Sequence, residues 1–189
     1  MQSQFHQSEN NITQDLIWVQ KAKEHPAHFE ALYNKYYEQI LKYVYQRVES
    51  KEEAYDITAQ VFTKAMLHLS NYEFKGLPFS AWLYRIAANE LNMLFRKNKV
   101  QHVINADINS LHQIKEEIHF NEDDEEKINL ILSEISNLNE DEIQLIEMRF
   151  FEKRSFKEIS EILDITENNA KVKTYRVLDK LKEKLLKKN

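Results

Sequence analysis

The scarcity of helix-breaking residues constrains this chain more than any other feature of its sequence. In 189 residues it has one glycine, Gly76, and two prolines, Pro26 and Pro78. Gly76 and Pro78 share the stretch NYEFKGLPFSAWLYRIAANE, residues 71–90, with several aromatic residues. We therefore predict a helical chain with a break at 71–78, and such a break is where a binding surface can be held without helical constraint.

The composition also excludes several classes of function. One glycine cannot build the glycine-rich loops of dinucleotide-binding or P-loop proteins, nor the nucleophile elbow of hydrolases. The absence of cysteine excludes disulfides and thiolate metal sites. The remaining metal candidates, His102, His112 and His119, lack the i, i+4 spacing of a helical metal pair. We expect no metal, no cofactor and no catalytic residues.

The chain shows no signal for the membrane or for secretion. No apolar run approaches the roughly 20 residues that span a bilayer, so direct membrane insertion is not expected. The first ten residues have no basic start and no apolar core, unlike a secretory signal. The default compartment is therefore the cytoplasm.

Helical periodicity runs through most of the chain. Apolar residues recur every three or four positions in 29–48, in 51–69 and in 79–98, and a weaker helix is expected at 12–24. Further on, Asn139 and Ser155 each precede a glutamate by three residues, which is capping-box spacing. No alternating strand pattern is present. The predicted fold class is all-α.

We expect two small helical domains, 1–99 and 126–189, joined by an acidic linker at 100–125. Residues 100–126 hold eight acidic side chains against one lysine, Lys115, which indicates a solvated tether. A loosely packed helix is an equally weighted alternative, because isoleucine and leucine recur there every three or four residues: Ile104, Ile108, Leu111, Ile114 and Ile118.

The second domain ends in a pattern typical of a helix–turn–helix. A short capped helix at 155–163 precedes Asp164, and a helix capped by Thr166 follows. Asp164 occupies the turn position usually held by glycine, and aspartate tolerates positive φ at some cost. One face of the last helix is apolar, formed by Ala170, Thr174, Leu178, Leu181 and Leu185, whereas its other face carries Lys171, Arg176, Lys180, Lys184 and Lys187.

This basic face contrasts with the rest of the chain. Residues 166–189 hold eight basic and three acidic side chains, whereas the whole chain has a formal net charge of −5. Lysine and arginine near a duplex neutralise phosphates, and residues at the front of the second helix, including Asn168 and Lys171, can reach base edges. The alternative is a merely solvated face.

Two further surfaces are candidates. On a helical wheel, Trp82, Arg85, Asn89 and Arg96 lie opposite the apolar side of 79–98, beside the aromatic loop at 72–78. Aromatics stack on unpaired bases and arginines hold phosphates, although Trp82 packed on a neighbouring helix is an open alternative. The third surface is the face of 51–69 with Asp56 and Gln60, which is either solvated or a dock for a basic partner helix.

Together these pieces resemble bacterial sigma factors of the extracytoplasmic-function (ECF) group. Residues 29–48 resemble the first core-binding helix of that family, and 53–62 its main polymerase-docking motif. FKG at 74–76 and WLYRIAAN at 82–89 resemble its −10 recognition loop and helix, and 138–185 its −35-binding domain.

The resemblance implies a subunit rather than an enzyme. Such a subunit binds core RNA polymerase and directs it to promoter DNA, and the family also implies an anti-sigma factor as a partner. The implied polymerase-docking residues are Glu53, Asp56 and Gln60. The implied −10 contacts are Tyr72, Phe74, Lys75, Trp82, Arg85, Asn89 and Arg96. The implied −35 contacts are Thr166, Glu167, Asn168, Lys171, Val172, Lys173, Tyr175 and Arg176.

Two other readings explain less of the chain. A stand-alone helix–turn–helix regulator accounts for 155–187 but not for the aromatic loop. A helical adaptor without nucleic acid leaves the basic face merely solvated.

Overall fold

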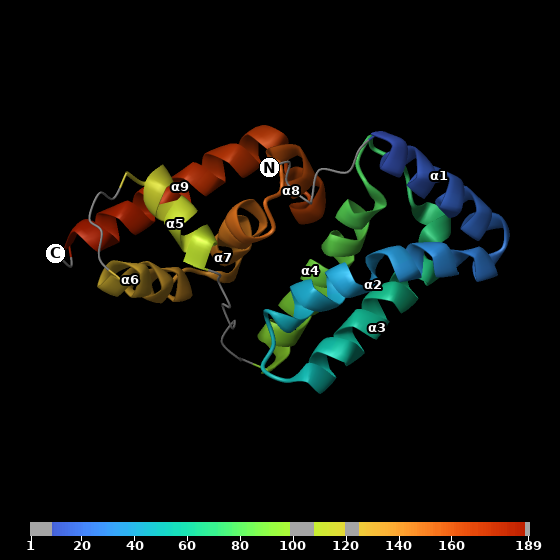
Figure 1. Cartoon of the computed structure of the whole chain (residues 1–189), viewed down its shortest axis with the longest axis horizontal. Coiled ribbons are helices and arrows are strands. Elements are labelled where there is room, and N and C mark those ends of the chain that lie inside the picture. Colours follow the sequence, from blue (N-terminus) through green and yellow to red (C-terminus); the bar gives the residue numbers. More distant parts are fainter. Residues whose placement is uncertain (1–8, 99–107, 120–124, 188–189) are drawn as a thin grey trace. The chain divides into compact units, whose positions relative to one another are not determined.

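The computed structural model describes residues 9–98, 108–119 and 125–187, and within them every regular element is a helix. The predicted all-α fold is therefore confirmed (Figure 1). The chain divides into two compact units, 1–103 and 104–189. Over the described part of the chain, no helix is both long and apolar enough to cross a bilayer.

The N-terminal unit is a set of packed helices (Figure 1). Their apolar stripes meet in one core. Its elements are α1 (Glu9–Glu24), η1 (Pro26–Phe29), α2 (Glu30–Tyr45), α3 (Lys51–Leu67), η2 (Leu69–Asn71) and α4 (Phe79–Asn98). The core includes Leu32, Ile40, Val61, Leu83 and Leu91, all nearly inaccessible to solvent. The sequence predicted these residues correctly, because they follow the helical period.

A glycine is favoured at the break between α3 and α4. Gly76 has a φ of 72°, a left-handed conformation that a side chain with a Cβ atom disfavours. Pro78 is buried beside it, and α4 begins at the next residue, Phe79. The single glycine of the chain thus stands where the backbone turns left-handed between two helices.

The C-terminal unit contains the helix–turn–helix. Its elements are α5 (Ile108–Glu117), α6 (Glu125–Ser136), α7 (Glu140–Ile146), the π-helix η3 (Glu147–Phe151), α8 (Phe156–Leu163) and α9 (Glu167–Lys187). The long helix α9 packs against α6, α7 and α8 (Figure 1). The predicted apolar face of α9 is buried throughout: Ala170, Thr174, Leu178, Leu181 and Leu185.

The predicted caps of this unit are present. Asn139 and Ser155 each form a capping box with the glutamate three residues on. Thr166 accepts a hydrogen bond from the Asn169 N–H at 3.2 Å, and Asp164 is left-handed with a φ of 56°. The helix–turn–helix therefore closes through an aspartate that adopts the conformation glycine would favour.

The segment at 100–125, expected to be an acidic linker, is partly a packed helix in its described residues. α5 occupies part of it and packs against α6 and η3, with Leu111, Ile114 and Ile118 buried. Ser110 adds a hydrogen bond from its hydroxyl to the Phe150 carbonyl at 3.1 Å. The recurring apolar residues decide the structure here, because they are buried whereas the acidic Glu116 and Glu117 of α5 are exposed. Ile104 and His102 lie outside the described residues.

Candidate nucleic-acid interface

The predicted docking residues lie on the outer face of α3. Asp56 and Gln60 are exposed one helical turn apart, and Glu53 is half-buried at the first turn. Ser50 caps this helix by accepting a hydrogen bond from the Glu53 N–H at 3.0 Å. The capped N-terminus favours the negative charges placed there. The structure therefore presents Asp56 and Gln60 together on an exposed face of α3, with Glu53 near its start.

Apolar side chains of α3 are exposed as well, and they were not predicted from the sequence. Tyr55, Met66 and Leu67 of α3 are exposed by 40%, 44% and 67%. A groove of about 230 Å³ between α2 and α3 adjoins Tyr55. In the sequence, these apolar residues lie outside the positions that form the buried stripe of α3. That placement was the signal from which their exposure could have been predicted. Exposed apolar area beside an acidic face suits a protein partner better than nucleic acid.

The loop before α4 contains an aromatic cluster that is mostly internal. The ring centroid of Tyr72 lies 5.2 Å from Phe79 and 5.1 Å from Trp82. Tyr72 is 9% exposed and Trp82 is half-buried. Trp82 therefore packs on the loop residue Tyr72 and on Phe79 of its own helix, whereas the alternative left open was packing on a neighbouring helix. Tyr72 supports the loop from inside and presents little of its ring to a ligand.

Other predicted −10 residues are accessible. Phe74 is 44% exposed, and Lys75 beside it is exposed as well. On α4, Asn89 and Arg96 are exposed, whereas Arg85 is half-buried. The structure thus brings an exposed phenyl ring and an exposed amide to the same loop-and-helix element.

The predicted −35 residues form one continuous exposed surface at the front of α9. Every one of them is exposed: Thr166, Glu167, Asn168, Lys171, Val172, Lys173, Tyr175 and Arg176. Tyr175 also packs against Phe156 of α8, with ring centroids 6.2 Å apart. Exposed polar and cationic residues on the second helix of a helix–turn–helix are arranged to enter a major groove.

Two lysines of the predicted basic face point elsewhere. Lys180 donates to both carboxylate oxygens of Glu142 on α7 at 2.8 Å. The Lys184 ammonium nitrogen lies 3.4 Å from a carboxylate oxygen of Glu134, a buried residue on α6. The expectation that these lysines share an open face with Lys171 and Arg176 is therefore wrong. Lys171 and Arg176, nearer the N-terminus of α9, are exposed.

The Lys180 pair changes the acidity of its partner. Burial acts to raise the pKa of Glu142, but hydrogen bonds from Lys180 and from the Asn139 N–H, with the charges of Lys180 and Lys184, together lower it below its usual value. Glu142 also closes the capping box of α7. One carboxylate thus joins the cap of α7 to the middle of α9.

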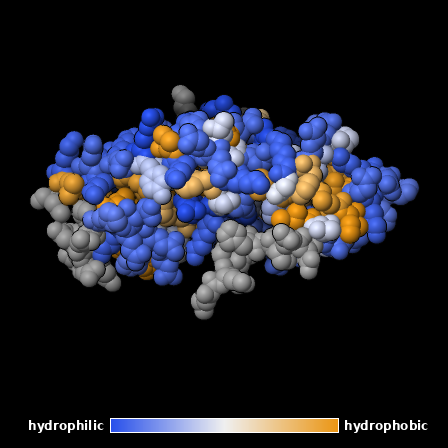
Figure 2. Space-filling view, turned by 90° about the horizontal axis from the view of Figure 1, so that it is seen from above, coloured by the Kyte–Doolittle hydropathy of each residue, from blue (hydrophilic) through white to orange (hydrophobic). Residues whose placement is uncertain are grey.

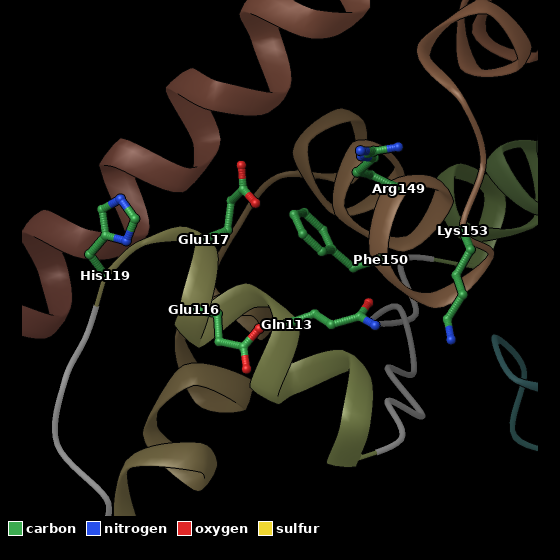
Figure 3. A pocket seen from close by; sticks show the side chains of 7 residues that line it. All are labelled: Gln113, Glu116, Glu117, His119, Arg149, Phe150 and Lys153. Atoms are coloured by element: carbon green, nitrogen blue, oxygen red, sulfur yellow. The ribbon is translucent and has the colours of Figure 1, made fainter. Parts of the chain in front are cut away.

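The C-terminal unit has an open pocket of about 470 Å³ (Figure 3). The carboxylates of Glu116 and Glu117 belong to α5, and Arg149 lies across from them on η3 (Figure 3). Small-molecule sites are usually apolar with few polar groups, unlike this lining. None of the predicted site residues lines it, and no cluster of potential metal ligands occurs in the described segments.

The surface of the molecule seen in Figure 2 is mainly hydrophilic, with hydrophobic side chains gathered in limited areas. Gathered apolar side chains of this kind are typical of contact surfaces.

Two family models match the chain in order. Sigma-70 region 2 matches residues 32–100, and Sigma-70 region 4 matches residues 135–183. The first match spans α2 to α4, with the loop between α3 and α4. The second spans α7 to most of α9.

Individual proteins agree with these matches. The RNA polymerase sigma factor SigZ of Bacillus subtilis is 29% identical over 156 residues, covering 82% of this chain and 86% of SigZ. The ECF RNA polymerase sigma factor SigM of the same organism is 24% identical, covering 81% and 92%. The ECF RNA polymerase sigma factor BldN of Streptomyces coelicolor is 24% identical, covering 79% of this chain but only 57% of BldN.

A solved structure of an RsbN–BldN complex contains a chain that is 22% identical. The alignment covers 86% of this chain and 96% of that one, with a TM-score of 0.38.

Proposed function

This chain belongs to the sigma-70 family of RNA polymerase sigma factors, in its ECF group, and we propose that it binds core RNA polymerase and directs promoter-specific initiation. The observation that carries the proposal is the ordered pair of matches, region 2 followed by region 4, on one chain. A stand-alone helix–turn–helix regulator needs only the second match, so that alternative is not favoured.

The docking surface in this proposal is the outer face of α3. Asp56 and Gln60 supply polar contacts, Glu53 adds charge at the first turn, and exposed Tyr55 supplies apolar area. A surface of mixed acidic and apolar character fits a partner helix with basic residues.

The −10 surface is the loop at 72–78 with the outer side of α4. Phe74 stacks on a promoter base removed from the duplex, and Asn89 offers a donor and an acceptor to a base edge. Lys75 and Arg96 contact phosphates. Tyr72 and Trp82 act mainly by shaping the loop, because their rings pack against each other and Phe79.

The −35 surface is the front of α9. Lys171, Lys173 and Arg176 are exposed cations that neutralise phosphates, and Asn168 reaches base edges in the major groove. Val172 and Tyr175 add apolar contacts, such as to a thymine methyl group. The turn at Asp164 sets the angle at which α9 leaves α8.

The proposed subunit acts without a catalytic site of its own and works in the cytoplasm, where its polymerase partner is found. An anti-sigma factor is a further partner that we propose from the family alone.

Asp56→Arg tests the docking surface. The substitution places a positive charge where we propose contact with a basic partner, so we expect loss of holoenzyme assembly with core polymerase in co-purification. Glu24→Arg is the matched control, because Glu24 is an exposed acidic residue at the end of α1, away from α3 in sequence. Assembly by Asp56→Arg at the level of Glu24→Arg would refute the docking role.

A further inference from the structure

Helix α1 precedes the residues that match Sigma-70 region 2, which begin at residue 32. Two of its side chains nevertheless reach the break between α3 and α4. Asp15 bonds to the end of this break at Phe79, and Lys23 bonds to its start at Tyr72. These contacts join residues 64 and 49 positions apart in the sequence.

Asp15 fixes the first residue of α4. Its carboxylate is 2% exposed and accepts hydrogen bonds from the Phe79 N–H at 3.2 Å, from the Lys35 ammonium at 2.6 Å, and from the Tyr36 hydroxyl. The first N–H groups of a helix have no partner within the helix, and a negative charge at that end is favourable. A buried carboxylate is stable only while such donors remain in place, so it holds α4 against α1 and α2.

Lys23 fixes the other end. Its ammonium donates to the Tyr72 carbonyl at 2.8 Å and more distantly to the Ser70 carbonyl at 3.4 Å. The Tyr72 ring packs against Phe79, which joins the two anchored ends directly. Between them lies the stretch with Gly76 in its left-handed conformation and with Phe74 exposed.

From this geometry we propose that α1 is a brace that sets the shape of the promoter-contacting loop, with Asp15 and Lys23 as positioning residues. The inference rests on the proposed −10 role of that loop. A loop anchored at both ends loses less conformational entropy when it captures a base, because the ordering is already present in the free protein. A weaker brace therefore slows promoter opening and leaves polymerase docking on α3 intact.

Lys23→Met is the decisive variant. Lys23 is exposed, and methionine keeps much of its aliphatic stem while removing the donor. Substitutions of Asp15 instead leave buried donors without an acceptor and risk unfolding. Lys23→Arg restores a charged donor, and Lys21→Met is the matched control, because it removes an exposed lysine from the same helix. Each full-length variant is assembled with core polymerase, and core affinity and the rate of open-complex formation are measured on a mapped promoter.

We expect Lys23→Met to slow open-complex formation about three- to tenfold, the effect of losing one partly exposed charge-assisted hydrogen bond. Core affinity should be unchanged, Lys23→Arg should recover most of the rate, and Lys21→Met should behave like the parent.

The brace would be overturned if Lys23→Met opened the promoter at the wild-type rate while Phe74→Ala and Asn89→Ala opened it slowly. That result would leave the −10 role standing. Equal losses of affinity and opening in Lys23→Met would also overturn it, since they indicate a general structural defect. If Phe74→Ala and Asn89→Ala both formed the open complex at the wild-type rate, the −10 role would be wrong. The brace would then be wrong as well, because it rests on that role.

Discussion

Asn89 and Trp82 share a predicted stripe on α4, yet the structure gives them different surroundings. Asn89 is exposed, whereas Trp82 packs against Tyr72 and Phe79. An exposed amide can discriminate between bases through its donor and acceptor, while a packed indole mainly stabilises the loop. We therefore propose that Asn89, rather than Trp82, sets base preference at the −10 element.

Asn89→Ala should change −10 base preference by about 1–3 kcal/mol of discrimination, the value of one good amide–base pair. Polymerase affinity should not change, because Asn89 lies outside the α3 face. Run-off transcription on a library randomised at the −10 element measures the effect. Met93→Ala is the control, because Met93 is 55% exposed on the same helix. An unchanged preference in Asn89→Ala would sink the assignment.

Asp164 carries a backbone cost that most other residues with a Cβ atom would increase. Its φ of 56° is disfavoured for residues with a Cβ atom, and aspartate and asparagine bear that cost best. Asp164→Ala should therefore lower the free energy of unfolding by about 1 kcal/mol, whereas Asp164→Asn should lower it less. Urea denaturation of the two variants makes the comparison, and a larger loss in Asp164→Asn would contradict the explanation.

At the scale of elements, the helices and caps followed from periodicity and local spacing. α2, α3 and α4 were predictable because their apolar residues recur every three or four positions. The turn at Asp164 was predictable because aspartate is one of the few residues that tolerate a positive φ. α5 was ambiguous, since its acidic residues indicated a linker and its apolar ones a packed helix. Composition alone does not reveal which face of a short helix finds a partner.

Contacts between distant elements were not predictable. The Lys180–Glu142 and Lys184–Glu134 pairs each need the packing of α9 on α6 and α7, so the wheel placed both lysines on an open face. The bonds of Asp15 to Phe79 and of Lys23 to Tyr72 have the same origin, because each joins α1 to a distant part of the chain. A helical wheel describes one helix, whereas the exposure of each face depends on its neighbours.

The Lys180–Glu142 pair predicts a pH dependence of stability. The folded-state pKa of Glu142 is lowered, so the stabilisation is present above its unfolded-state pKa and is lost as pH falls through the folded-state pKa. At neutral pH, Lys180→Met should cost roughly 0.2–1 kcal/mol, because both partners are partly exposed. This difference from the parent should disappear in acid.

Urea unfolding across a pH series measures that difference. Lys182→Met is the control, since Lys182 lies on the same helix and should show no such convergence in acid. A deficit of Lys180→Met that persists unchanged at low pH would assign its cause to packing rather than to the ion pair.

At the scale of the whole molecule, charge is divided unevenly along the chain. The formal net charge is −5, yet the front of α9 presents Lys171, Lys173 and Arg176. Net negative charge opposes binding of the isolated chain to DNA, and the polymerase supplies most of the affinity in our proposal. In a gel shift without polymerase, the chain should show no tight, sequence-specific complex with promoter DNA. Such a complex would favour a stand-alone regulator.

Reconstitution with core RNA polymerase on genomic DNA, followed by mapping of transcription start sites, tests the central claim most directly. We predict start sites that are absent with core polymerase alone and that share −10 and −35 sequences upstream. Asp56→Arg should abolish these sites, whereas Glu24→Arg should retain them. A start-site map identical to that of core polymerase alone, obtained with folded wild-type chain, would contradict the proposal that this chain directs promoter-specific initiation.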